Sequence, residues 1–171
     1  MNSAIRTWRS ILTVLLTLPV AGYVSAQGDA GHAGGQNIED MKFSASPGMP
    51  SCSTGAVLSG DPSKGPSIIL GKTAKGCSVP WHWHTPNEHL MMVSGVARLE
   101  MKGGKPLTLR AGGFALMPSK HIHRFHCTAT CLLYVYSDAP YDIHYVDAQE
   151  KEISPDDALK AVKEKAGGPK K

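Results

Sequence analysis

Short runs of β-branched, aromatic and other apolar residues alternate with clusters of Gly, Pro, Ser and Asp from residue 43 onward. Turn clusters such as SPGMPS, SGDPSKGPS, MKGGKP, RAGG and SDAP separate runs such as GAVL, PSIILGK, EHLMMVSG, VARLEM, FALMP, HIHRFHC and CLLYVYS. Many short strands at this spacing are typical of an antiparallel sandwich or barrel. The sequence therefore predicts an all-β domain over residues 41–150, which is long enough to bury a core.

The first 26 residues have the pattern of a targeting segment. Arg6 and Arg9 precede an apolar stretch that is shorter than a membrane-spanning helix, and the small residues VSA follow it. Residues 1–26 are therefore predicted to be a signal peptide that is cleaved before Gln27. The mature protein is then expected to be periplasmic or secreted, without a stable membrane anchor.

Two further segments flank the predicted β domain. Residues 27–40 are rich in glycine without a repeat and are expected to be flexible. Residues 151–171 are expected to form a short C-terminal helix and a basic tail, since Ser154 can cap a helix that has Pro155 at its first position.

The four cysteines suit an exported protein, because disulfides persist outside the cytoplasm. Four cysteines allow three pairings. The stretch CTATC is typical of two strands joined by a three-residue turn, which would place Cys127 opposite Cys131 and leave Cys52 for Cys77. The alternative is that these residues are small buried thiols.

Three histidines and a glutamate fall within the stretch HWHTPNEH. Alternate side chains of a strand share a face, so His82 and His84 point together while Trp81 and Trp83 point away. A bend at TP lets Glu88 return beside the histidines from the next strand. Two imidazoles and a carboxylate form most of a metal coordination shell. A further ligand must come from elsewhere, and the stretch HIHRFH offers His121 and His123 on one face and His126 on the other.

These residues carry a resemblance to the cupins. The first cupin motif is matched by Gly76, His82, His84, Glu88 and Gly95, and the second is matched in part by Gly112, Pro118 and His123. The second motif departs from the family pattern at Lys120, where glycine is usual, and at Cys127, where asparagine is usual. The chain resembles small exported bacterial single-domain cupins over roughly residues 52 to 147.

The resemblance implies a double-stranded β-helix, or jelly-roll barrel, with His82, His84, Glu88 and His123 around one divalent transition metal ion. The ion could be Zn, Cu, Mn, Fe or Ni. Family likeness also implies a homodimer joined at strand edges, which would cover outward apolar residues including the two tryptophans.

Strand parity predicts an apolar pocket beside this metal. Leu90 and Met92 share the parity of Glu88. If Cys127 and Cys131 lie opposite each other across a turn, then Phe125 faces Leu133 and His123 faces Val135. Such a wall suits a small-molecule ligand or substrate with an apolar part. His121 shares the face of His123 and is the candidate catalytic proton carrier, whereas Tyr134 and Tyr136 face away.

Two classes of function fit these residues. The first is a metal-dependent enzyme, of oxygenase, isomerase or lyase type, that acts on a small oxygen-bearing molecule. The second is an envelope protein that binds a metal or small ligand without turnover. Nucleic acid is not an expected partner, because loss of Arg6 and Arg9 leaves 16 basic against 14 acidic residues, a scattered net charge of only +2.

Overall fold

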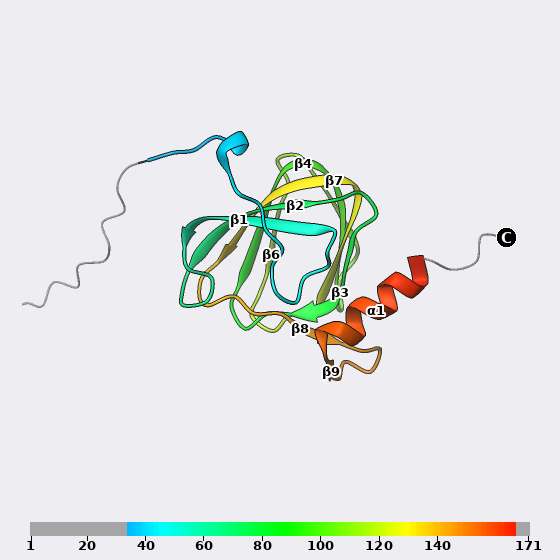
Figure 1. The fold of residues 1–171 in the computed structure, drawn as a ribbon. Coiled ribbons are helices and arrows are strands. Elements are labelled where there is room, and N and C mark those ends of the chain that lie inside the picture. Colours follow the sequence, from blue (N-terminus) through cyan, green and yellow to red (C-terminus); the bar gives the residue numbers. More distant parts are fainter. Residues whose placement is uncertain (1–33, 167–171) are drawn as a thin grey trace, which may run out of the picture. The chain divides into compact units, whose positions relative to one another are not determined.

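Nine strands enclose one apolar interior in residues 34–166, which are the residues described by this computed structural model (Figure 1). The strands lie in the unit that begins at Gln36. Their bounds are β1 (Ser53–Gly60), β2 (Ser67–Thr73), β3 (Ser78–Trp83), β4 (Glu88–Met101), β5 (Leu107–Arg110), β6 (Phe114–Met117), β7 (His123–Ser137), β8 (His144–Val146) and β9 (Glu152–Ile153). The predicted all-β jelly roll with one short C-terminal helix is confirmed.

Strand β7 organises the sheet because it has neighbours along both of its edges. On one edge it pairs with β4 over nearly its whole length. On the other edge its C-terminal half pairs with β2 and its N-terminal half pairs with β3. Strand β1 extends the sheet beyond β2, β8 and β9 extend it beyond β3, and β5 and β6 pair with β4. All pairs are antiparallel, and in the described part of the chain the sheet does not close on itself.

The turn predicted at CTATC is wrong, since β7 runs through it as one bent strand, and β4 likewise joins two runs that were predicted to be separate. The register between β4 and β7 shifts near Gly95, where φ is 90°. A Cβ atom at Gly95 would lie 2.1 Å from the carbonyl oxygen of Thr130. The two backbones approach closely at this bend, so both strands turn together and stay paired.

Both disulfide pairings are confirmed, although the Cys127–Cys131 bridge lies within one strand and not across a turn between two strands. Cys127 and Cys131 are linked within β7 and span its bend. Cys52 is linked to Cys77, the residue that precedes β3. The amide of Cys127 donates to the carbonyl of Cys77, so the two bridges lie on adjacent backbone segments.

The core follows the two-residue alternation of the strands. In β7 the odd-numbered residues point inward, and Leu99 of β4 is fully buried beside Phe125. The predicted alternation of inward and outward side chains in β7 is therefore confirmed, but the predicted pairing across a turn is wrong. Because the two halves of β7 do not fold back on each other, Phe125 pairs with Leu99 rather than facing Leu133.

The end of the described chain forms a β-hairpin and then helix α1 (Pro155–Ala166). The backbone N–H of Asp157 donates to the hydroxyl of Ser154 at 3.1 Å, as expected for an N-cap. Helix α1 packs against β3 and β8, near the end of the barrel where β9 also lies (Figure 1).

The predicted signal peptide, residues 27–33 of the Gly-rich segment and the last five residues of the tail lie outside the described residues. Residues Ile38–Asp40 form a single exposed 3-10 turn, η1. Between residues 34 and 166 there is no helix with the length and apolar character needed to cross a membrane.

Candidate metal centre

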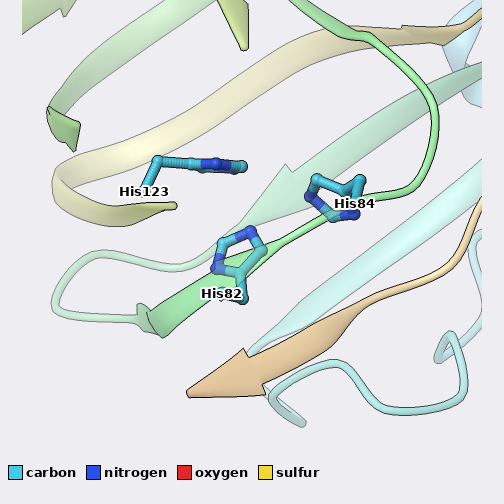
Figure 2. Close-up of side chains that lie close together, drawn as sticks. All are labelled: His82, His84 and His123. Atoms are coloured by element: carbon cyan, nitrogen blue, oxygen red, sulfur yellow. The ribbon is translucent and has the colours of Figure 1, made fainter. Parts of the chain in front are cut away.

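Three imidazoles converge inside the barrel, from β3, from the residue that follows β3 and from the start of β7. One ring nitrogen from each of His82, His84 and His123 lies within 4.8 Å of those of the other two. Figure 2 shows the three rings facing a common space. The strand pairing explains this arrangement, because His82 is the direct cross-strand partner of His123. Strand parity predicted that His82 and His84 share a face, and the cupin resemblance implied His123 as the ligand from the second motif.

Each ring is oriented by a backbone carbonyl. The Nδ1–H of His82 donates to the oxygen of Pro80 at 2.6 Å, and that of His123 donates to the oxygen of His121 at 2.8 Å. The Nδ1–H of His84 donates to the carbonyl of Asp142. A carbonyl oxygen can only accept, so each Nδ1 carries a proton, and the neutral form of each ring presents an unprotonated Nε2 to the interior.

Two of these inward nitrogens have no hydrogen-bond partner. Among the described residues, the Nε2 atoms of His84 and His123 are buried and unsatisfied. Buried polar atoms are normally paired, and leaving one unpaired costs about 1–3 kcal/mol. A single electron-pair acceptor placed between them would satisfy both nitrogens at once.

Glu88 adds a carboxylate oxygen to the same space. Its Oε2 atom lies 3.5 Å from His84 Nε2 and 3.3 Å from His123 Nε2. Its Oε1 atom accepts a hydrogen bond of 3.1 Å from the hydroxyl of Tyr141. The two oxygens of the carboxylate thus have different partners, and only Oε2 faces the imidazoles.

The ionisation states suit a metal site. Burial lowers the pKa of His82 well below 6.5, and burial also lowers the pKa of His84, so both rings are neutral at pH 7. Burial acts to raise the pKa of Glu88, but the positive charge that the adjacent imidazoles carry when protonated outweighs it and lowers that pKa to about 2. Neutral imidazole and ionised carboxylate are the forms that bind metals.

The spacing fits one ion held by several ligands. Ligand atoms at about 2.1 Å from a common ion lie roughly 3.0–3.4 Å from each other, close to the distances from Glu88 Oε2 to His84 and His123. Nitrogen donors with one carboxylate are typical of first-row transition metals, which favours these over Mg²⁺ or Ca²⁺. The donor set therefore fits the predicted metal, but it does not distinguish among the candidate ions.

A cavity of about 340 Å³ opens next to the cluster. His82, Glu88 and His123 form part of its wall, and the remainder is largely apolar. The N-terminal strap, residues 44–49, contributes to the wall as well. It is attached to the barrel by the bridge between Ser44 and Gly55 and by the Tyr145 hydroxyl, which donates to the Gly48 carbonyl. The volume is near the lower limit for small-molecule pockets.

Comparison with known proteins agrees with this geometry. The family described as "Cupin domain" matches residues 70–136, which include all four residues around the cluster. Residues 70–136 therefore carry a cupin domain. No curated protein matches it in sequence.

Solved structures of similar fold share little sequence with this cupin. The polyketide cyclase RemF from Streptomyces resistomycificus is 18% identical, with a TM-score of 0.58, and the match covers 67% of this chain and 86% of that one. An RmlC-like cupin from Shewanella frigidimarina is 17% identical, with a TM-score of 0.52 and coverages of 61% and 88%. The DMSP lyase DddQ from Ruegeria pomeroyi is 17% identical, with a TM-score of 0.50 and coverages of 67% and 60%. At such identities the likeness concerns the fold.

Four of the five predicted pocket residues line the cavity of this cupin: Leu90, Phe125, Leu133 and Val135. The fifth, Met92, is buried in the core cluster and is not part of the cavity wall. Parity alone could not separate these positions, because it gives the face of a strand but not the depth of a side chain within the barrel.

His121 occupies a different position from the other predicted site residues. Its carbonyl orients His123, while its half-buried side chain is neither in the imidazole cluster nor in the cavity wall. The structure therefore assigns its backbone a positioning contact, and the role of its side chain as a proton carrier stays a prediction.

Tyr141 was missed by the sequence reasoning. It lies between β7 and β8 in a segment without regular structure, where parity gives no direction. Its hydroxyl reaches Glu88, its ring lies 4.7 Å from the His84 ring, and burial raises its pKa well above 10. The only available sequence signal was an aromatic residue soon after the strand that carries His123.

In the described part of the chain, His89, His126 and His144 lie outside the cluster, and so do Trp81 and Trp83. His126 bonds to Ser78, His89 packs against Tyr136 on the outer face, and His144 lies between Asp142 and Glu152. Trp83 stacks on His144, while Lys102 and Arg124 lie over Trp81. Much of the outward aromatic surface is thus covered by side chains of the same chain.

Proposed function

We propose that this cupin binds one divalent transition metal ion through His82, His84, Glu88 and His123, and with it acts on a small oxygen-bearing molecule. The proposal rests mainly on the buried Nε2 atoms of His84 and His123. Both atoms face one carboxylate oxygen, and neither has a hydrogen-bond partner among the described residues. A shared ion would satisfy both nitrogens and the oxygen at once.

The chain itself supplies orientation and a dry environment. Three backbone carbonyls hold the rings with Nε2 inward, and such fixed outer contacts keep ligands in place. A bound ion would polarise an oxygen-bearing group of the substrate. The apolar wall next to the cluster limits water and strengthens electrostatic interactions there.

Tyr141 favours an enzyme over a passive binding protein. It lines the cavity at its polar end and carries a proton that it donates to Glu88 Oε1. A hydroxyl in this place can hold or donate a proton beside a reacting group. His121 stays the second candidate for proton transfer. The similar structures that are named as a cyclase and a lyase show that catalysis is compatible with this fold, but their reactions are not assigned to this chain.

Turnover is the test of the enzymatic part of the proposal. Metal-loaded and chelator-stripped protein would be incubated with small diketones, enediols and hydroxy-acids while oxygen uptake and products are followed. We expect conversion by loaded wild type, loss on stripping and recovery on reloading. Stoichiometric metal without conversion of any compound would favour the alternative, a metal- or ligand-binding protein without turnover.

We also propose that the protein acts outside the cytoplasm. The two disulfides support this location, because disulfides persist outside the cytoplasm. Intact-mass analysis of exported protein should give a chain that begins at Gln27, and an intact Met1 would contradict this. The predicted homodimer is retained as a proposal, and light scattering at micromolar concentration would test it.

A further inference from the structure

The charge of the cavity wall limits what the cavity can bind. Among its wall residues within the described chain, none is Lys or Arg, whereas Glu88 and Asp142 are acidic. The cation nearest in sequence to the cavity residue Ser63 is Lys64, whose ammonium group is paired with Asp61 at 2.7 Å. A ligand with a negative charge far from the metal would therefore find no cation to offset its lost hydration.

Much of the cavity wall away from the imidazole cluster is apolar. Leu90 and Val135 are cross-strand partners on the inner face, and so are Ile69 and Val135. Phe125 follows His123 on the same face, with Val79 as its cross-strand partner. Apolar side chains thus continue from the imidazole cluster across the floor of the cavity.

The polar groups on this part of the wall are uncharged hydroxyls, and some of them already have partners. Ser53 and Thr73 hydrogen-bond to each other through their side chains at 2.9 Å. One of these two hydroxyl protons is therefore already used, and in the described cavity wall no Lys or Arg stands beside them to anchor an anion.

We infer that the cavity takes a small, largely apolar molecule that carries its oxygen donors at one end and no charge at the other. This inference rests on the proposed function, since the oxygen donors are assigned to the metal end. A volume of about 340 Å³ accommodates a single substituted ring or a short branched chain rather than a polymer. Compounds with two separated anionic groups, such as dicarboxylates, are excluded as good ligands.

Two hydroxamic acids test the inference because they share one metal-binding head. One carries a methyl group and the other a carboxylate at the para position of a benzohydroxamic acid. Metal content of each protein would be measured first, and affinity would then be measured by titration calorimetry of the metal-loaded full chain. We expect the methyl compound to bind at least tenfold more tightly than the carboxylate compound.

A matched pair of substitutions places one new cation inside or outside the cavity. Val57 lines the cavity and is 50% exposed, so Val57→Arg adds a cation at the rim without emptying the core. Val93 is 42% exposed and does not line the cavity, so Val93→Arg is the control. We expect Val57→Arg to reduce the preference for the methyl compound at least fivefold and Val93→Arg to leave it unchanged.

The outcomes separate the inference from the proposed function. Equal affinity of the two compounds for metal-loaded wild type would overturn the inference alone. So would tighter binding of the carboxylate compound, or an equal effect of the two arginine variants. Purified protein that takes up no metal would instead contradict the proposed function, and the inference with it.

Discussion

Two groups of inward-facing side chains in this barrel are equally buried but differ in what stabilises them. The apolar group gains free energy from leaving water, and it includes Ala97, Leu99 and Leu109, which are at most 3% exposed. The polar group is at most 5% exposed and comprises His82, His84, Glu88 and His123. Burial of such polar atoms is unfavourable unless they have partners. The apolar group therefore maintains the fold, whereas the polar group depends on the fold and, in the proposed function, on a bound ion.

The largest stability effect is expected in the apolar group. Leu99→Ala should lower the free energy of unfolding by about 2–5 kcal/mol, because the fully buried side chain leaves a cavity in the core. Urea unfolding would measure it. Leu107 is the control, since it is the cross-strand partner of Leu99 but is 42% exposed. Leu107→Ala should cost less than about 0.5 kcal/mol, and equal losses in the two variants would contradict the placement of the core.

Acid should weaken the metal-free protein through the polar group. The folded-state pKa values of His82 and His84 are lowered, so below pH 6.5 the unfolded chain binds protons that the folded chain does not. Stability should therefore fall as pH drops below 6.5, by up to roughly 1.4 kcal/mol per pH unit for each histidine. Glu88, whose pKa is lowered to about 2, adds a further loss between about pH 4.5 and 2.

Unfolding midpoints of the stripped protein between pH 7 and 5 would check this dependence. The Leu99→Ala variant should keep the slope of wild type, because the histidines are unchanged, and His84→Ala should show a shallower one. A wild-type midpoint that is the same at pH 7 and pH 5 would show that the buried rings are not held neutral.

A smaller effect is expected at the contact between Tyr141 and Glu88. Tyr141→Phe removes the hydrogen bond to Oε1, so Glu88 loses a constraint on its orientation. Metal affinity should fall by roughly tenfold, as is typical for residues that orient metal ligands, while the stoichiometry stays at one. Tyr134→Phe, at a 37% exposed ring on the outer face, should leave affinity unchanged. Unaltered metal affinity in both variants would mean that the hydrogen bond from Tyr141 does not orient Glu88 for metal binding.

The same contrast between the two groups explains what could be predicted from the sequence. The faces of His82, His84 and His123 followed from strand parity, which depends only on local geometry. The position of Glu88 followed from its place just after the bend in the chain. These are short-range properties, and the structure brings all four residues together.

Features that depend on the path of the whole chain could not be predicted from strand parity. The sequence predicted two strands in place of β7, because the CTATC stretch has the residues of a turn. In the structure β7 pairs with β4 along nearly its whole length, and this pairing keeps it continuous. The contact of Tyr141 and the carbonyl contact of Asp142 arise from an irregular segment whose course is set by tertiary packing. Met92 shows the same limit, since its face was predicted correctly and its depth was not.

Metal content of wild type and His84→Ala tests the central claim most directly. Both proteins would be purified without a histidine tag and analysed by inductively coupled plasma mass spectrometry, with His126→Ala as a control, because His126 bonds to Ser78 outside the cluster. Wild type and the His126→Ala variant should each hold about one transition metal ion per chain, and the His84→Ala variant, still folded, less than about a tenth of that. Equal trace metal in all three proteins would show that the imidazole cluster is not a metal site.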